Sequence, residues 1–532
     1  MPHETLSKIK PREYQKQIYE VCKEHNCLVI LPTGIGKTLI ALMLAINRQK
    51  KFPGSKIVFL APTRPLAEQH LEYFKKYLPE LFADLQLFTG KVDAKKRKEI
   101  WQTADIIFST PQCVGNDLKK YLYDLGDVSL LIEDECHRCL KNYSYTYVVE
   151  KYKQQAKNQR VLGLTASPGA DRETIERIAK NLNIERIEIR TRESEDVKEY
   201  IQEAKIEVIK INFPPEFDKI RTSLKIIFDR KTNELKNRRL LFGPPTKRFL
   251  LETQARIMKS ISSGNKHFNL LSGASACSQA IKLQHALELL ETQTLSSFSE
   301  YMQDLFQQAR EQKSKAVQSM VRQPEFNHAY IGLIELLAKK VEHPKLEILR
   351  NILKNSIIEN KKLKVIVFTQ YRVTAVKIMN EIKDIPEIIP RVFIGQAIKE
   401  MRSGEKHGLS QKEQGAVINE FKEGKINVLV ATSIGEEGLD IPEVNAVIFY
   451  EPVPSAIRKI QRAGRTARLM EGKIITLVTL GTRDEAYYYA AMGKENKMYS
   501  AVNSLKKEMD KSKNISIEDK IKEIKESQEK LF

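Results

Sequence analysis

Short apolar runs alternate with amphipathic helical stretches over the first two hundred residues of the chain. The apolar runs lie at residues 28–31, 57–60, 85–88, 106–108, 130–132 and 161–164, and polar residues, glycine or proline follow each of them. Runs of this kind are typical of buried parallel strands that helices cover on both faces. We therefore expect a doubly wound parallel α/β sheet, whose ligands gather at the carboxyl ends of the strands.

The pattern changes after about residue 200 and changes back near residue 343. Residues 216–342 lack short β-like runs and are expected to form long helices. Apolar runs return at 365–368, 392–394, 428–430, 447–449 and 474–478, which predicts a second parallel sheet of similar size. The predicted segments are a first α/β lobe (1–205), an all-helical insert (206–342), a second α/β lobe (343–500) and a tail rich in Lys and Glu (501–532).

A glycine-containing loop over residues 32–38 lies between the first predicted strand and a strong helix former. Gly34 and Gly36 let the backbone curl, so that its N–H groups and the start of the helix can hold phosphates. Lys37 adds a positive charge beside them. The strict form of this motif has a glycine where Leu31 stands, so the loop alone leaves two interpretations: a nucleotide site or a structural turn.

A pair of acids, Asp134 and Glu135, directly follows the predicted strand 130–132. At that edge of the sheet, Asp134 and the hydroxyl of Thr38 can hold Mg²⁺, and Glu135 can orient and deprotonate an attacking water. The alternative is a charged strand end that faces solvent. The glycine loop in the same predicted sheet favours the catalytic interpretation.

The formal net charge of +20 over 532 residues indicates a polyanionic partner, nucleic acid first, or else a lysine-rich surface. Within residues 221–260, eleven Lys and Arg oppose three acids, as expected of a face that contacts phosphates or of a solvated helix face.

Six scattered cysteines suit a reducing cytosol. Cys136 and Cys139 have no second pair with zinc spacing, so we expect no zinc site there. No run reaches the ~20 apolar residues of a membrane helix, and no signal peptide is apparent, so we expect no membrane association and a cytoplasmic location.

Six segments occur in a fixed order along the chain: 12–15 (Arg-Glu-Tyr-Gln), 33–38, 134–137 (Asp-Glu-Cys-His), 165–167 (Thr-Ala-Ser), 431–442 and 461–468 (Gln-Arg-Ala-Gly-Arg-Thr-Ala-Arg). They resemble the Q motif and motifs I, II, III, V and VI of superfamily 2 DEAD/DEAH-type helicases. The resemblance implies two RecA-like lobes, with ATP and Mg²⁺ as cofactors.

The resemblance also implies roles for individual residues. Catalysis falls to Lys37, Asp134, Glu135, Gln461, Arg465 and Arg468, of which the last two would be arginine fingers on the γ-phosphate and Gln461 would help to position the water. The nucleotide would contact Arg12, Gln15, Pro32, Thr33, Gly34, Ile35, Gly36, Lys37, Thr38, Gly438 and Asp440, with Gln15 on the adenine edge and Mg²⁺ on Thr38 and Asp134. Thr165 and Ser167 would couple this site to nucleic acid.

Further segments resemble the nucleic-acid motifs of the same family. They are 61–65, 89–90 and 109–112 in the first lobe and 368–370, 395–396 and Thr432 in the second. Their hydroxyl and backbone N–H groups would hold phosphates of one strand, which positions the strand without reading its sequence.

A basic helical insert of over a hundred residues between the lobes is similar to that of the archaeal Hef helicases, of their FANCM relatives and, more distantly, of RIG-I and Dicer. Segments 408–414, 450–458 and 481–488 look closest to Hef, whose thumb-like insert is implicated in binding branched DNA. Longer Hef proteins carry a nuclease with an E-R-K tripeptide, which this chain lacks. We therefore expect this chain to be either the helicase part of a longer protein or a member of a nuclease-less branch. A nuclease or a sliding clamp is a candidate protein partner.

The leading functional hypothesis is an ATP-dependent DNA helicase or translocase that acts on forks and junctions in repair and recombination, with 3′-to-5′ polarity. A second hypothesis keeps the motor and takes double-stranded RNA as the ligand, as RIG-I-like relatives do. A third is a non-catalytic clamp or scaffold that has lost hydrolysis. Five intact residues argue against it: Lys37, Asp134, Glu135, Arg465 and Arg468.

Overall fold

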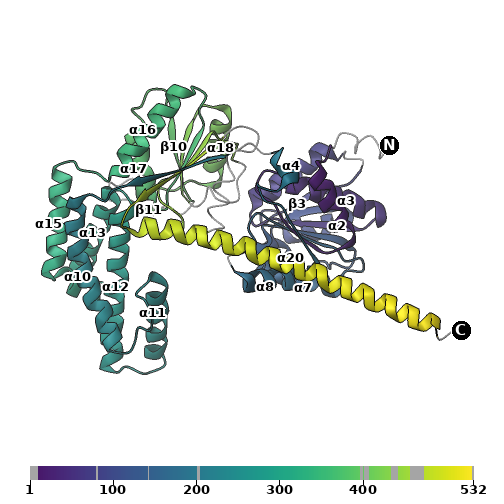
Figure 1. Cartoon of the computed structure of the whole chain (residues 1–532), viewed down its shortest axis with the longest axis horizontal. Helices are drawn as coiled ribbons and strands as arrows, with labels where there is room; N and C mark the ends of the chain where they lie inside the picture. The colour runs from purple at the N-terminus through teal and green to yellow at the C-terminus, as the bar shows by residue number, and fades with distance from the viewer. Residues whose placement is uncertain are drawn as a thin grey trace.

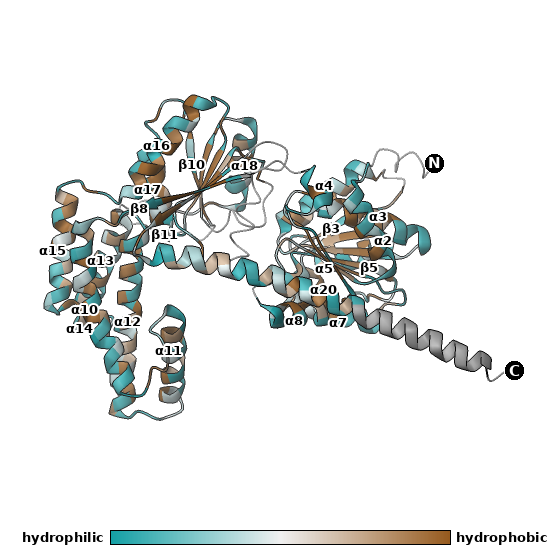
Figure 2. Cartoon of the chain, in the orientation of Figure 1, coloured by the Kyte–Doolittle hydropathy of each residue, from teal (hydrophilic) through white to brown (hydrophobic). Residues whose placement is uncertain are grey.

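The computed structural model describes residues 10–78, 82–141, 143–169, 171–200, 204–395, 399–400, 406–432, 441–455 and 472–529. Two α/β lobes, each built on a parallel sheet, lie apart in the view of Figure 1, and a helical insert extends from one of them. Figure 2 shows that the strands of both sheets are largely hydrophobic. Among the described residues, no helix combines the length and the apolar character that crossing a membrane requires.

The first lobe holds seven parallel strands in the order β3-β4-β2-β5-β6-β1-β7. The strands are β1 (Cys27–Ile30), β2 (Lys56–Leu60), β3 (Leu85–Phe88), β4 (Ile106–Ser109), β5 (Val128–Asp134), β6 (Val161–Thr165) and β7 (Arg186–Ile189). All six strands expected from apolar runs are present. The seventh, β7, was not predicted, because its sequence Arg-Ile-Glu-Ile alternates, as befits an edge strand with one half-exposed face.

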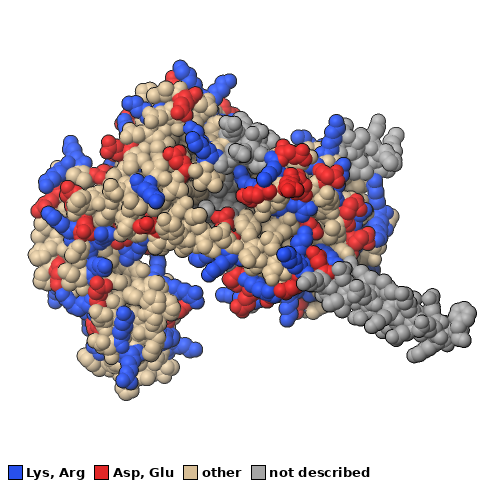
Figure 3. Space-filling view, in the orientation of Figure 1, with Lys and Arg blue, Asp and Glu red and all other residues tan. Residues whose placement is uncertain are grey.

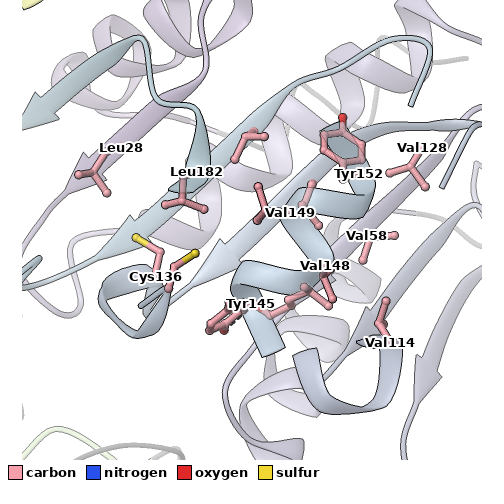
Figure 4. Close-up of a cluster of buried hydrophobic side chains, with 14 of the residues drawn as sticks. Leu28, Val58, Val114, Val128, Cys136, Tyr145, Val148, Val149, Tyr152 and Leu182 are labelled. Carbon is pink, nitrogen blue, oxygen red and sulfur yellow. Dashed lines mark hydrogen bonds between the residues drawn. The ribbon is translucent and has the colours of Figure 1, made fainter. Parts of the chain in front are cut away.

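Helices cover both faces of the first sheet. One face packs against α2 (Glu13–Glu24), α3 (Lys37–Lys51) and α4 (Arg64–Tyr77). The other packs against α5 (Ala94–Thr103), α6 (Pro111–Lys119), α7 (Ser144–Gln155) and α8 (Arg172–Leu182). Figure 4 shows part of this second layer, where Val148 and Tyr152 of α7 lie over the sheet residues Val58 and Val128. Burying apolar side chains on both faces fixes the strand ends that carry the predicted motifs.

The second lobe holds six parallel strands in the order β10-β13-β9-β14-β15-β8. They are β8 (Ala204–Ile211), β9 (Val365–Phe368), β10 (Pro390–Phe393), β13 (Val428–Ala431), β14 (Ala446–Phe449) and β15 (Gly472–Thr479), flanked by α16 (Pro344–Glu359), α17 (Arg372–Ile382) and α18 (Gln411–Glu423). A separate two-stranded antiparallel pair consists of β11 (Lys399–Glu400) and β12 (Lys406–His407).

Strand β8 belongs to the second sheet, although it precedes the insert in the chain. It pairs with β15 from Ala204 opposite Gly472 to Ile211 opposite Thr479. The boundary expected at residue 206 therefore falls inside a strand of the second lobe. The alternation of polar and apolar residues in β8 hid it, because an edge strand needs fewer apolar positions than a central one.

The insert is a helical bundle with its own apolar core. It comprises α10 (Pro215–Asn237), α11 (Lys247–Ser262), α12 (Phe268–Thr292), α13 (Leu295–Arg310), α14 (Lys315–Val321) and α15 (Pro324–Ala338). Helix α11 and the adjoining end of α12 form a hairpin that projects from the rest of the bundle (Figure 1). The all-helical character expected for residues 216–342 is confirmed.

A single long helix, α20 (Arg483–Glu529), runs from the second lobe across the first (Figure 1). Val502 and Leu505 are buried in the core layer that also contains α7 and α8. Lys506 pairs with Glu188 at 3.2 Å, and Glu508 pairs with Arg172 at 2.7 Å. The segment expected to be a charged tail from residue 501 therefore begins inside a helix that packs on the first lobe.

A fully buried ion pair between Lys345 and Asp484 joins the insert, the second lobe and α20. The Lys345 ammonium also donates to the carbonyl of Thr292, at the end of α12 (3.0 Å), and the backbone N–H of Thr479 donates to Asp484 (3.1 Å). The pair thus ties together the ends of α12 and β15 and the starts of α16 and α20. It fixes the insert relative to the second sheet.

Asp484→Ala is expected to lower the midpoint of thermal unfolding strongly. Removing one partner of a buried pair leaves the Lys345 charge uncompensated, which costs about 3–5 kcal/mol. Calorimetry or circular dichroism measures the shift. The double variant Lys345→Met/Asp484→Leu should lose less, since it leaves no unpaired charge. As a control, Arg172→Ala breaks the exposed ion pair between Arg172 of α8 and Glu508 of α20 and should barely move the midpoint. Equal shifts for Asp484→Ala and Arg172→Ala would contradict this account.

Candidate nucleotide site and nucleic-acid interface

The glycine loop has a backbone that suits a phosphate cradle. Gly34 and Gly36 both have φ of +88°, and α3 begins directly afterwards at Lys37. A Cβ on Gly36 would lie 2.1 Å from the amide nitrogen of Gln15, so a side chain does not fit there. The Lys37 ammonium donates to the carbonyl of Leu31 at 2.9 Å and so lies across the loop. The loop residues therefore fit a nucleotide triphosphate, with the charge of Lys37 already beside the cradle.

Leu31 departs from the strict motif without disturbing this arrangement. Its side chain is fully buried in the core layer between the sheet and helices α2 to α4. Its carbonyl oxygen accepts from the Lys37 ammonium of the loop. An apolar residue is therefore accommodated at the position where the strict pattern has glycine.

The N-terminal end of α2 is hydrogen-bonded to the glycine loop. The Tyr14 hydroxyl donates to the Ile35 carbonyl at 2.6 Å, and the Gln15 amide nitrogen donates to the same oxygen at 3.2 Å. The Gln15 amide oxygen accepts from the backbone N–H of Arg12 at 2.9 Å, and the Arg12 guanidinium lies 4.8 Å from the ring centroid of Tyr200. Gln15 thus joins α2 to the loop through its amide nitrogen, while its amide oxygen caps the N-terminal end of α2.

The acid pair lies at the carboxyl end of β5, beside the glycine loop of β1. The imidazole Nε2 of His70 donates to Oδ2 of Asp134 at 2.9 Å, and the Phe59 ring lies 4.4 Å from the His70 ring. Burial would raise the pKa of Asp134, but the His70 hydrogen bond and the charges of His70 and Lys37 outweigh it and hold the pKa below its usual range. A buried, ionised carboxylate fits the Mg²⁺ expected on Asp134 and Thr38.

Glu135 adopts a left-handed backbone conformation, with φ 49° and ψ 46°. Such a conformation is uncommon outside glycine, and tertiary contacts must hold it. The His137 Nδ1 atom lies 3.2 Å from Oε2 of Glu135, and the Thr165 hydroxyl donates to the same oxygen at 3.4 Å. Thr165 also bonds to the backbone of Ser167. Motifs II and III therefore meet at the carboxylate expected to activate water.

Five expected catalytic or nucleotide-binding residues lie outside the described residues: Gly438, Asp440, Gln461, Arg465 and Arg468. Their roles stay predictions. The described part of the site is the half that the first lobe contributes, where the structure brings together Arg12, Gln15, Pro32, Thr33, Gly34, Ile35, Gly36, Lys37, Thr38, Asp134 and Glu135 at the carboxyl edge of the sheet or beside it.

The segments that resemble nucleic-acid motifs also follow strand ends. Residues 61–65 follow β2, 89–90 follow β3 and 109–112 begin at the last residue of β4, all at the edge that carries the acid pair. In the second lobe, 369–370 follow β9, and Thr432 follows β13. Gln396 lies outside the described residues. Each lobe thus presents its candidate phosphate contacts at one edge of its sheet.

A buried carboxylate, Glu451, holds the second-lobe loop in place. It accepts from the backbone N–H of Gln370 and from the Thr369 hydroxyl (3.2 Å). The side-chain oxygen of Gln293, from the insert, accepts from Thr369 at 3.4 Å and from Thr374 at 2.8 Å. The candidate nucleic-acid loop is therefore joined directly to the insert. Neither this contact nor the one between His70 and Asp134 leaves a signal in the linear sequence, because the partners lie 64 to 82 residues apart.

Family models match three parts of the chain. "DEAD/DEAH box helicase" matches residues 12–175, "Helicase conserved C-terminal domain" matches 344–470, and "Putative ATP-dependent RNA helicase, helical bundle" matches 217–343. Among solved structures, the helicase domain of Hef from Pyrococcus furiosus is 41% identical, with a TM-score of 0.66 over 90% of this chain and 98% of that chain.

Curated relatives carry helicase names but differ in the nucleic acid that those names state. "Putative ATP-dependent RNA helicase MJ1505" of Methanocaldococcus jannaschii is 38% identical over 92% of this chain. "ATP-dependent DNA helicase fml1" of Schizosaccharomyces pombe and "ATP-dependent DNA helicase mph1" of Aspergillus oryzae are each 32% identical over 90% of it. The chain spans 61%, 58% and 44% of these three relatives, respectively. With its two parallel-sheet lobes, its helical insert and its match to nearly the whole Hef helicase domain, the chain belongs to the superfamily 2 DEAD/DEAH-box helicases, in their Hef and FANCM-like branch.

Proposed function

We propose that this chain is an ATP-dependent DNA helicase or translocase that acts on branched DNA, with 3′-to-5′ polarity, in fork repair and recombination. The observation that carries the proposal is the meeting of Lys37, Asp134 and Glu135 at one sheet edge, with candidate phosphate contacts along the same edge. The archaeal Hef domain is similar over nearly its whole length, and two relatives are named DNA helicases.

In the proposed reaction the first lobe binds ATP and Mg²⁺ and orients the attacking water. Backbone N–H groups of residues 33–38 and the ammonium of Lys37 hold the triphosphate, with Arg12 and Gln15 on its adenine side. Thr38 and Asp134 hold Mg²⁺, which neutralises phosphate charge when it is bound. Glu135 orients the attacking water and accepts its proton.

The proposed second-lobe residues complete the site when the lobes close. Arg465 and Arg468 stabilise charge on the γ-phosphate, Gln461 helps to position the water, and Gly438 and Asp440 lie near the ribose. Thr165 and Ser167 transmit the state of the nucleotide to the nucleic-acid loops. Because the strand contacts go to phosphates, base sequence is not read.

DNA rather than RNA is proposed as the substrate on two grounds: the Hef similarity and the names of the DNA-helicase relatives. Double-stranded RNA remains the alternative, because one archaeal relative and the insert model carry RNA-helicase names. Our proposal also includes a cytoplasmic location, which the six free thiols suit. A nuclease or a sliding clamp stays an open candidate as partner.

ATPase assays with three stimulants separate these functions. Forked DNA is expected to stimulate hydrolysis most, linear duplex DNA less and double-stranded RNA least. Stronger stimulation by double-stranded RNA than by forked DNA would favour the RNA alternative. Hydrolysis that none of the three stimulates would contradict a nucleic-acid motor.

Neutralising four basic residues of the insert should weaken duplex and fork binding. The variant carries Arg238→Gln, Arg239→Gln, Lys247→Gln and Arg248→Gln. Removing one phosphate contact makes the slope of log affinity against log salt shallower by about 0.9. Titrations of fork and single-stranded DNA at several salt concentrations measure this, and fork affinity should fall more. An unchanged slope and fork affinity would show that the basic face is only solvated.

Three of these four residues already pair with acids, which sets the design of the control. Arg248 pairs with Glu252, Lys247 with Glu288 and Arg238 with Glu234. Glu288 is buried, so Lys247→Gln alone is compared with the other three substitutions to separate DNA contact from packing. A loss confined to Lys247→Gln would indicate a structural effect.

A further inference from the structure

Exposed apolar side chains concentrate on the hairpin of the insert. Fourteen large hydrophobic residues are exposed among the described residues, and five of them fall within residues 242–271: Phe242, Leu251, Met258, Phe268 and Leu271. Single exposed hydrophobic residues are normal on a protein surface, but a local concentration marks an interaction site. The hairpin is therefore a candidate interface.

The interior of the hairpin is already filled, so these side chains are not displaced core residues. Leu250 and Ile257 of α11 and Cys277 of α12 are buried between the two helices. Gly273 lets the loop before α11 approach closely, because a Cβ there would lie 2.1 Å from the Leu240 side chain. The exposed residues thus stand outside a closely packed support.

Two of the exposed residues, Phe242 and Phe268, are aromatic. Phe268 is the first residue of α12 and is 80% exposed. Leu271 follows one turn later on the same side of the helix and is also exposed. Phe242, in the loop before α11, is 60% exposed, and the Arg256 guanidinium lies 5.4 Å from its ring centroid. A ring with a cation beside it is a surface on which a planar group can stack.

The charge around these rings points to a polyanionic occupant. Residues 236–268 contain eight Lys and Arg and one acid, a net charge of +7. The acid, Glu252, is paired with Arg248 at 2.8 Å. Blue side chains outnumber red ones on the part of Figure 3 that holds the hairpin. A ligand that combines negative charge with flat apolar faces is a nucleic acid whose bases are unpaired.

We propose that the hairpin stacks unpaired bases of a branched nucleic acid on Phe268, with Leu271 beside it and Phe242 as a second platform. The proposal rests on the function proposed above and gives a structural reason why branched DNA would be preferred over linear duplex DNA. A linear duplex hides its base faces and offers only phosphates, whereas a branch point offers both. The surrounding cations attract any duplex, and the rings select the branch.

The test measures the affinity of the full chain for a fork that carries 2-aminopurine at its branch point, and the fluorescence change on binding. Phe268→Ala should weaken fork binding on the order of tenfold and remove the fluorescence change, because stacking contributes a loss of about this size per base. Affinity for a linear duplex of equal length should change by less than about twofold, since phosphate contacts remain.

Matched variants separate stacking from other effects. Phe268→Trp should restore fork affinity and the fluorescence change, whereas Phe268→Leu should restore neither. Ile358→Ala removes an apolar residue of α16 that is 72% exposed and should behave as the wild type. Circular dichroism is expected to show that every variant folds, because Phe268 lies on the surface.

Several outcomes would overturn the proposal. One is full fork affinity in both Phe268→Ala and Phe242→Ala, and another is an equal loss for fork and linear duplex. Rescue by Phe268→Leu would show apolar contact without stacking. If Phe268→Ala keeps its affinity for the fork but loses binding to phosphatidylserine vesicles, the surface binds a membrane instead. If the wild type itself shows no preference for forks, the proposed function fails. If the wild type prefers forks and both Phe268→Ala and Phe242→Ala match it, only this inference fails.

Discussion

Glu135→Gln is expected to abolish ATP turnover and to leave ATP binding intact. The substitution keeps the size of the side chain and its ability to accept from Thr165, but an amide cannot take a proton from water. The loss should be on the order of 10²- to 10⁴-fold, the range for removal of a general base. Steady-state hydrolysis and titration with a fluorescent ATP analogue measure the two properties separately.

Lys37→Ala should instead weaken ATP binding, because the Lys37 ammonium lies beside the phosphate cradle.

The matched control for Glu135→Gln is Glu133→Gln, since it makes the same change of functional group two residues away. Glu133 is fully buried, and burial holds its pKa well above the usual range. Turnover close to wild type in Glu135→Gln would show that another group activates the water.

Arg465→Ala is expected to reduce ATP turnover on the order of 10³-fold or more, as the loss of an arginine finger does. The nucleotide site is proposed to be divided between Lys37 on the first lobe and Arg465 with Arg468 on the second, so ATP should draw the two lobes together. Hydrolysis assays measure the loss, and small-angle scattering with and without a non-hydrolysable ATP analogue measures the closure.

Arg465→Lys distinguishes charge from geometry. Lysine keeps the positive charge but lacks the planar fork that binds a phosphate through two donors, so most of the loss should persist. ATP affinity should change much less than turnover, because the first lobe keeps its phosphate contacts. An ATP-bound structure with Arg465 far from the nucleotide in every state would contradict the assignment.

Buried strands were predictable from the sequence, but two of the four edge strands of the parallel sheets, β7 and β8, and the long-range contacts were not. The predicted central strands carry continuous apolar runs, because both of their faces are covered. Strands β7 and β8 alternate instead, and the end of α20 looked like a charged tail because Lys and Glu predominate from residue 501 onwards, although Val502 and Leu505 are buried. A low density of apolar residues is common to edge strands, tails and helices that cross a surface.

The same contrast holds for the candidate site. Residues 33–38 and the pair Asp134 and Glu135 lie in local motifs whose backbone chemistry sequence alone indicates. The hydrogen bond from His70 to Asp134 and the contacts of Glu451 depend on which strand ends the fold brings together. Such partners become visible only when the strand order is known.

Strand separation is the most direct test of the central claim. A fork with one labelled arm is incubated with the wild-type chain and ATP, with ATPγS in place of ATP, and with the Glu135→Gln variant and ATP. We expect the labelled strand to be released only by the wild type with ATP, and faster from a fork than from a linear duplex. Equal release without hydrolysis, or none from the fork with ATP, would contradict an ATP-driven motor on branched DNA.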